Sequence, residues 1–192
     1  MPKRDSAHMN AQRERILRAT IECIAQKGVE GMSLGDIRKQ SGLSTGAIYT
    51  HFANKEDIVA EALRYGVIDM LDLPDDWKSL KRMICSLENQ LDFDIETVAR
   101  LRLHLRAECT RPGKLHDIYR PILEDAVEMI AQHLARQQDR GEIRLTLPAR
   151  QTALAISAFV DGALWMALSI DRPLDELKSE LSDGLDRFVS AN

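Results

Sequence analysis

Apolar residues recur every three or four positions along most of the chain, which is the spacing of helices with one buried face. Alternation of apolar and polar residues at strand spacing is not seen. The pattern therefore predicts an all-α protein. Glycine and proline residues divide it into segments, and we expect longer helices near residues 10–27, 57–73, 77–90, 94–110, 115–139, 148–170 and 173–190.

The stretch from Ser33 onward has the local signals of two short helices joined by a tight turn. Ser33 followed by Asp36 is a capping-box start, because the hydroxyl can accept a backbone N–H at the start of a helix. Gly42 suits the left-handed turn that ends this helix, and Ser44 can cap a second one over Thr45–His51. Helices this short are marginal alone, so tertiary packing must hold them.

The second short helix is expected to be exposed, with small residues first and hydrogen-bonding residues later. Such a helix fits the major groove of DNA, which is about 12 Å wide. An ordinary helical hairpin inside a larger bundle has the same spacing. Spacing alone therefore leaves both interpretations open.

The run STGAIYTHFANKEDIVAEAL resembles the DNA-binding signature of the TetR (tetracycline-repressor) family of regulators, over roughly the first quarter to third of the chain. The resemblance implies an N-terminal three-helix helix-turn-helix head, residues 1–55, and a C-terminal helical effector-binding and dimerisation bundle, residues 56–192. By analogy and chemistry, Thr45 and Ala47 should face bases, and Tyr49, His51 and Lys55 should hold phosphates. The full set of expected DNA-binding residues is Ser33, Arg38, Ser44, Thr45, Gly46, Ala47, Tyr49, Thr50, His51 and Lys55.

The charge of the chain divides unevenly. Residues 1–55 carry nine Lys and Arg against five Asp and Glu, whereas the remainder carries 17 against 25. The net charge of −4 is thus the sum of a basic N-terminal part and an acidic remainder. This distribution is expected for a protein whose small N-terminal head binds DNA. Ordinary two-domain proteins also show such asymmetry, so it is weak support alone.

The last two expected helices carry more apolar surface than one core needs. Residues 153–168 are apolar almost all round, so the helix must bury two faces. From Pro173 on, leucines recur at spacings of three and four, which forms a single seam. Both could be core helices of a monomer, but the resemblance implies a four-helix bundle across a homodimer. The expected interface residues are Phe159, Gly162, Met166, Leu177, Leu181, Leu185 and Phe188.

The body also offers candidates for an effector pocket. We expect a cavity between the two tryptophans with His104 or His133 as polar anchors, although the same side chains could equally form a solid core. The candidates are Met83, Leu87, Phe93, Leu101, His104, Leu105, Met129, His133, Phe159 and Trp165.

Catalytic and metal-binding motifs are missing from the sequence. There is no GxSxG, Gly-rich phosphate loop or HExxH, and the three cysteines have no ligand spacing. We therefore expect neither an enzyme nor a cofactor or metal, and we expect the cysteines to be free thiols. Because no signal-peptide pattern or apolar run of about 20 residues is recognised, we expect a cytoplasmic protein with no membrane partner.

Together these observations predict a sequence-specific, homodimeric DNA-binding transcriptional regulator. We expect a repressor that is released from a palindromic double-stranded DNA operator by an unidentified small-molecule effector. The alternative from another class is an all-helical protein–protein interaction adaptor. Binding to duplex DNA that weakens steeply with salt would distinguish the two.

Overall fold

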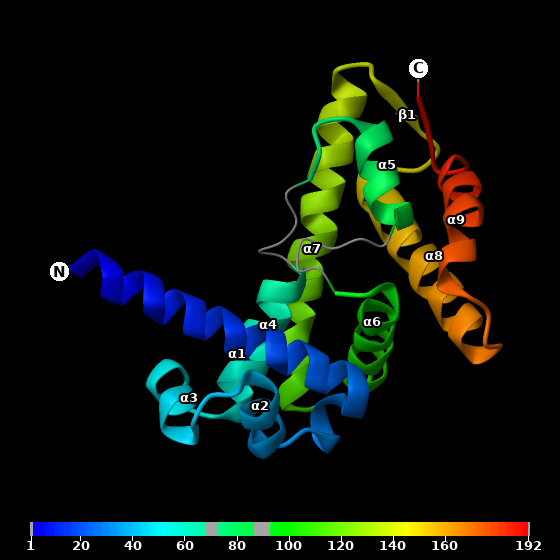
Figure 1. Ribbon diagram of the computed structural model, residues 1–192. Helices are drawn as coiled ribbons and strands as arrows, with labels where there is room; N and C mark the ends of the chain where they lie inside the picture. The colour runs from blue at the N-terminus through cyan, green and yellow to red at the C-terminus, as the bar shows by residue number, and fades with distance from the viewer. Residues whose placement is uncertain (1, 68–72, 87–92, 192) are drawn as a thin grey trace. The chain divides into compact units, whose positions relative to one another are not determined.

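The computed structural model describes residues 2–67, 73–86 and 93–191, and its secondary structure is almost entirely helical (Figure 1). The prediction of an all-α fold is therefore confirmed. The chain divides into two compact units, Met1–Asp69 with Arg100–Arg120, and Met70–Ala99 with Pro121–Asn192. This division by packing differs from the functional boundary expected after residue 55, which remains a prediction.

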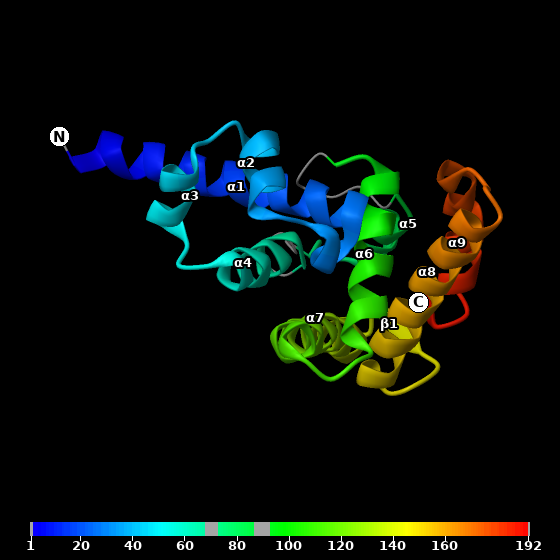
Figure 2. The same ribbon diagram turned by 90° about the horizontal axis from the view of Figure 1, so that it is seen from below.

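The first unit is built from α1 (Pro2–Gly31), α2 (Leu34–Ser41), α3 (Thr45–His51) and α4 (Lys55–Val67). In both views α1 runs beside the short helices and α4 (Figures 1 and 2), and it packs against all three. Each helix contributes isoleucines whose side chains are fully buried: Ile16, Ile24, Ile37, Ile48 and Ile58. Burial of these apolar faces holds helices that are too short to be stable alone.

Helix α1 starts earlier than the sequence pattern predicted, whereas its regular part stops at Gly28, next to the expected end at residue 27. We expected a helix over residues 10–27, but the helix begins at Pro2. Proline is well suited to the first turn, and nothing after it interrupts the helix until Gly28. Gly28 has a φ of 71° and kinks the helix three residues before its end.

The part of the chain that links the units includes α6 (Ile95–Cys109) and α7 (Lys114–Asp139), each of which contributes residues to both. The predicted helices over 94–110 and 115–139 are thus found within one residue of their expected ends. The predicted helices over 57–73 and 77–90 are found as α4 and α5 (Trp77–Ser86), and their remaining residues 68–72 and 87–90 lie outside the described residues.

The second unit packs α5, the later part of α7, α8 (Ala149–Ser169) and α9 (Leu177–Leu185) around one apolar core. A short 3-10 helix, Leu174–Glu176, leads into α9. Helix α9 packs against both α5 and α8.

A small antiparallel sheet in the second unit was not predicted. Strand β1 (Ile143–Leu145) pairs with β2 (Val189–Ala191), with Leu145 opposite Val189, and Figure 1 shows the C-terminal strand beside β1. The expected helix over 173–190 is therefore wrong at its end, because α9 stops at Leu185. Strands of three residues are too short to produce a recognisable alternation.

Helix α8 is long and apolar enough to cross a bilayer, by length and composition alone, and 33% of the window that passes this test is buried. The core helix of a soluble protein has the same composition. Other apolar residues of α8, among them Leu154, Trp165 and Met166, are exposed.

Candidate nucleic-acid interface

Helix α2 begins at the predicted capping box. The Ser33 hydroxyl accepts the Asp36 backbone N–H at 3.2 Å, and the Ser33 N–H donates to Asp36 Oδ2 at 2.8 Å. Lys27 of α1 donates to Asp36 Oδ1 at 2.5 Å. The hydrogen bonds from Lys27 and then Ser33 hold the pKa of the Asp36 carboxyl well below its usual range. The start of α2 is thus tied to α1.

The turn between α2 and α3 is closed by Gly42. Its φ of 64° lies in the left-handed region, and its N–H donates to Arg38 O at 3.0 Å. A Cβ at this position would lie 2.8 Å from Arg15 Nη2, so the Arg15 guanidinium covers the turn. A side chain at residue 42 would therefore be strained by the backbone conformation and would displace the Arg15 guanidinium.

Helix α3 presents its polar face outward, as predicted. The Ser44 hydroxyl accepts the Ala47 N–H at 3.1 Å, which confirms the expected cap. Ile48 is its buried residue, whereas 53% of Tyr49 is exposed. The structure also leaves Thr45, Gly46 and Thr50 exposed and Ala47 half-buried. An exposed helix with small residues in its first turn matches a recognition helix.

Two of the expected phosphate contacts already have partners within the protein. Lys55 Nζ donates to Val29 O at 3.0 Å and also to Met32 O, so the ammonium has one N–H left for another group. The Ser33 hydroxyl donates to Asp36 Oδ2 at 2.6 Å. Arg38, in contrast, is exposed at the surface. The DNA-binding assignments of these residues remain predictions.

His51 is held by a residue that the sequence did not single out. Its Nε2 lies 3.3 Å from Gln12 Oε1, and Gln12 Nε2 lies 3.0 Å from His8 Nε2. Because an amide oxygen only accepts and an amide N–H only donates, His51 donates to Gln12 and Gln12 donates to His8. A spacing of four residues on α1 is a weak sequence signal, so only the packing of α3 against α1 identifies this chain of hydrogen bonds.

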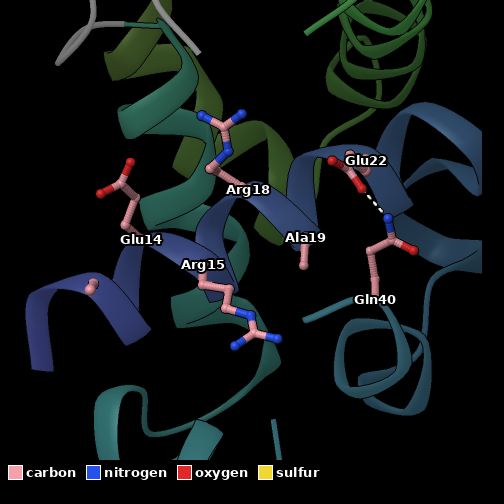
Figure 3. Close-up of a pocket in the computed structure, with 7 residues that line it drawn as sticks. Glu14, Arg15, Arg18, Ala19, Glu22 and Gln40 are labelled. Atoms are coloured by element: carbon pink, nitrogen blue, oxygen red, sulfur yellow. Dashed lines mark hydrogen bonds between the residues drawn. The ribbon is translucent and has the colours of Figure 1, made fainter. Parts of the chain in front are cut away.

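A shallow groove lies between α1 and α2 and is lined by side chains of both charges (Figure 3). Gln40 of α2 donates to Glu22 of α1 across it. Figure 3 shows Arg15 and Arg18 leaving α1 in different directions. With Glu14 also present, the groove has two positive and two negative side chains. Its lining residues are Ala11, Glu14, Arg15, Arg18, Ala19, Glu22 and Gln40.

The expected pocket residues are divided between the two units. Leu101, His104 and Leu105 belong to the first unit, where the His104 ring lies 3.4 Å from the point that a Cβ on Gly28 would occupy. Met83, Met129, His133 and Phe159 belong to the second unit, with half-buried Phe93, and Leu87 lies outside the described residues.

One pocket assignment is wrong, and that of His133 stays a prediction. Trp165 is 54% exposed, so it does not line an interior cavity of this chain. His133 is 5% exposed, and burial lowers its pKa below the usual value. It contacts the side-chain amide of buried Gln137 on the next turn of α7. The remaining assignments stay predictions.

The expected dimer seam on the last helix is also wrong. Leu177, Leu181 and Leu185 are at most 2% exposed and belong to the core of their own unit. Their spacing is that of any helix with one buried face, and here the face packs against α5 and α8. Side chains that are already buried are not available to a partner.

The other expected dimer residues lie on or beside α8. The Phe159 ring sits against Gly184 and makes an edge contact with Phe188, with ring centroids 6.1 Å apart. Gly162 faces open space and Met166 is 51% exposed. We define the α8 stripe as the exposed residues of this helix that recur at helical spacing: Leu154, Ala158, Gly162, Trp165 and Met166. Large apolar side chains in such a row are unusual on a monomer.

The described residues contain no group of three or more His, Cys, Asp or Glu side chains that could hold a metal ion. The three cysteines are free thiols. Burial raises the pKa of the Cys109 thiol to about 11 and also raises the pKa of Cys23 and Cys85. Thiols with raised pKa are poor nucleophiles, so the cysteines lack the environment of a reactive site.

A family model described as "Bacterial regulatory proteins, tetR family" matches residues 16–62, which contain α2 and α3. The regulator TtgR from Pseudomonas putida is 27% identical over an alignment of 202 positions. The alignment covers 97% of this chain and 95% of TtgR.

Solved structures have the same fold. A TetR-family regulator from Rhodococcus sp. is 25% identical with a TM-score of 0.73, covering 92% of this chain and 97% of that one. FadR from Bacillus subtilis, solved with stearoyl-CoA, is 22% identical with a TM-score of 0.66, covering 90% and 96%. The capped turn, the exposed helix α3 and these matches lead to one conclusion: residues 16–62 form a DNA-binding domain like that of the tetR family of bacterial regulatory proteins, and α2 and α3 are its helix-turn-helix.

Proposed function

We propose that this regulator is a cytoplasmic homodimeric repressor that binds a palindromic operator and leaves it when a small molecule binds. The observation that carries the proposal is the exposed polar face of α3, capped by Ser44 and held on the unit by buried Ile48. A helix presented this way can enter a major groove without unfolding any part of its unit.

Base contacts are proposed for the first turn of α3, and phosphate contacts for residues of α2 and of the later part of α3. Thr45 and Ala47, in its first turn, are the proposed base contacts, because a hydroxyl can hydrogen-bond to a base edge and a methyl group can meet the methyl of thymine. Tyr49 and Arg38 are exposed and are proposed to hold phosphates. Changes at Thr45 should thus alter sequence preference, whereas Tyr49→Phe should weaken binding to all sequences.

The α8 stripe is the proposed dimer interface. It presents Leu154, Trp165 and Met166, each 44–54% exposed, beside Gly162, where a partner helix can approach closely. Two copies related by a two-fold axis would present two recognition helices, so the operator should be an inverted repeat. Half-sites on one face of B-DNA lie about 34–36 Å apart or a multiple of this.

Control by an effector is proposed for the body of the protein. Ligand response is typical of the family, and one neighbour of the same fold binds stearoyl-CoA. An effector that favours a wrongly spaced dimer by about 3 kcal/mol lowers operator affinity by roughly two orders of magnitude. His133 is the proposed polar anchor, since it is buried and held neutral.

Selection of bound fragments from a random duplex pool tests the proposal. We expect inverted repeats, and affinity that falls steeply as salt rises because bound phosphates release counterions. A protein that enriches no duplex, at low salt and without effector, would instead support the protein–protein adaptor. Enriched sites without inverted repeats would contradict the dimeric arrangement but not DNA binding.

A further inference from the structure

The start of α1 carries a row of polar side chains that the DNA-binding assignments leave unused. His8, Gln12 and Arg15 follow one another at spacings of four and three, so they share one face of the helix. His8 and Arg15 are exposed, and Gln12 is half-buried. We call these three residues the α1 edge.

The α1 edge borders the recognition helix at both of its ends. Gln12 accepts the hydrogen bond from His51, the last residue of α3. Arg15 covers Gly42, in the turn that leads into α3. The edge is therefore continuous with the surface that enters the groove, and it belongs to the same compact unit.

The chemistry of the α1 edge suits phosphate. The Arg15 guanidinium is a cation with five N–H donors, and no hydrogen bond or ion pair of this side chain is found in the described part of the chain. His8 Nε2 accepts a hydrogen bond from Gln12, so the proton of the neutral ring is on Nδ1. The Nδ1–H group can then donate to another partner. Each feature favours a partner with negative charge and acceptor oxygens.

We propose that the α1 edge is a second strip of the DNA interface, which contacts the operator backbone next to the groove that α3 occupies. Arg15 and His8 bind phosphate, and Gln12 is a positioning residue that holds the His51 ring. The occupant is the same duplex that α3 reads, since the edge and α3 form one continuous surface. The inference rests on the proposed function.

A charge series at Gln12 tests the proposal on the full-length protein with its selected duplex. Gln12→Ala should weaken binding about fivefold through loss of the His51 partner. Gln12→Glu keeps an acceptor for His51 but places an anion beside phosphate, so it should weaken binding further, by about tenfold or more. Gln12→Lys should steepen the dependence of log affinity on log salt by about 0.9 for each protomer.

Two further measurements separate an interface from a folding effect. Arg15→Gln, at an exposed position, should make the salt dependence shallower by about 0.9 per protomer. The effects of Gln12→Ala and His51→Ala should not add, because one removes the partner of the other. Changes of Gln132 to Ala, Glu and Lys are the matched control, because Gln132 is an exposed glutamine of α7 in the second unit. Each should change affinity by less than about twofold.

The outcomes distinguish this inference from the function on which it rests. If Gln12→Lys, Gln12→Glu and Arg15→Gln behave like the Gln132 controls while Tyr49→Phe still weakens binding, the α1 edge does not contact DNA and the helix-turn-helix does. If the unaltered protein binds no duplex, the proposed function itself fails. Thermal unfolding of each variant confirms that the compared proteins are folded.

Discussion

The helix-turn-helix and the α8–α9 pair differ in how their sequences relate to their structures. In α2 and α3, side chains hydrogen-bond to backbone atoms three residues away, as Ser33 and Ser44 do. In α8 and α9, apolar residues must be buried, but each can pack against its own chain or against a second copy. A capping side chain has a hydrogen-bond partner that can be identified from the sequence, whereas an apolar helix face does not. Substitutions in the two regions should therefore have different consequences.

Leu181→Glu should unfold the second unit. Leu181 is 0% exposed, and an unpaired carboxylate at a buried site costs more than about 4 kcal/mol. Urea denaturation followed by circular dichroism measures this, with Lys178→Glu, at an exposed position of the same helix, as a near-neutral control. A stable, folded monomer would restore the α9 seam as the dimer interface.

Trp165→Glu should dissociate the proposed dimer and leave each chain folded. A tryptophan at the centre of an interface typically contributes at least about 2 kcal/mol, which raises the dimer dissociation constant about thirtyfold. Sedimentation measures the oligomeric state, and Ser179→Glu on the exposed face of α9 serves as the control. An unchanged dimer would place the interface away from the α8 stripe.

Gly184→Ala and Gly162→Ala form a matched pair. A Cβ at Gly184 would overlap the Phe159 ring, so Gly184→Ala should destabilise the chain by about 1–2 kcal/mol. A Cβ at Gly162 meets nothing within 4 Å, so Gly162→Ala should leave the stability of the chain unchanged or raise it by up to about 1 kcal/mol. Equal melting temperatures would contradict the packing of Phe159 on α9.

Ser44→Ala should lower the free energy of unfolding by about 1 kcal/mol, because the hydroxyl caps the recognition helix. The same change should weaken operator binding. Chemical denaturation and duplex titration measure the two effects. Ser44→Asp, which keeps a capping acceptor, should restore stability but not affinity, since it adds a negative charge beside DNA. Recovery of both would argue that residue 44 lies away from phosphate.

Asp36 should make a contribution to stability that disappears in acid. Its pKa is lower in the folded chain than in the unfolded chain, where an Asp carboxyl titrates near about 3.9. The stabilisation is therefore present above about pH 5 and is lost as pH falls through the unfolded and then the folded pKa. The difference in unfolding free energy between the protein and Asp36→Asn should be constant from pH 7 to 5 and shrink below it.

The sequence alone determined the features that depend on neighbours in the chain. The caps at Ser33 and Ser44, the left-handed turn at Gly42 and the ends of α6 and α7 were predicted because each depends on residues within a few positions. The family signature in residues 44–63 and the basic charge of the head were also visible. These features specify the fold class and the DNA-binding helix.

Tertiary structure decided which partner each surface has. It places Leu181 in its own core and leaves Trp165 exposed, although both are apolar residues at helical spacing. It commits Lys55 to the carbonyls of Val29 and Met32, and it brings Gln12 to His51 across 39 positions. Spacing along a helix fixes which side chains share a face. What that face meets depends on how distant helices pack, which no local pattern encodes.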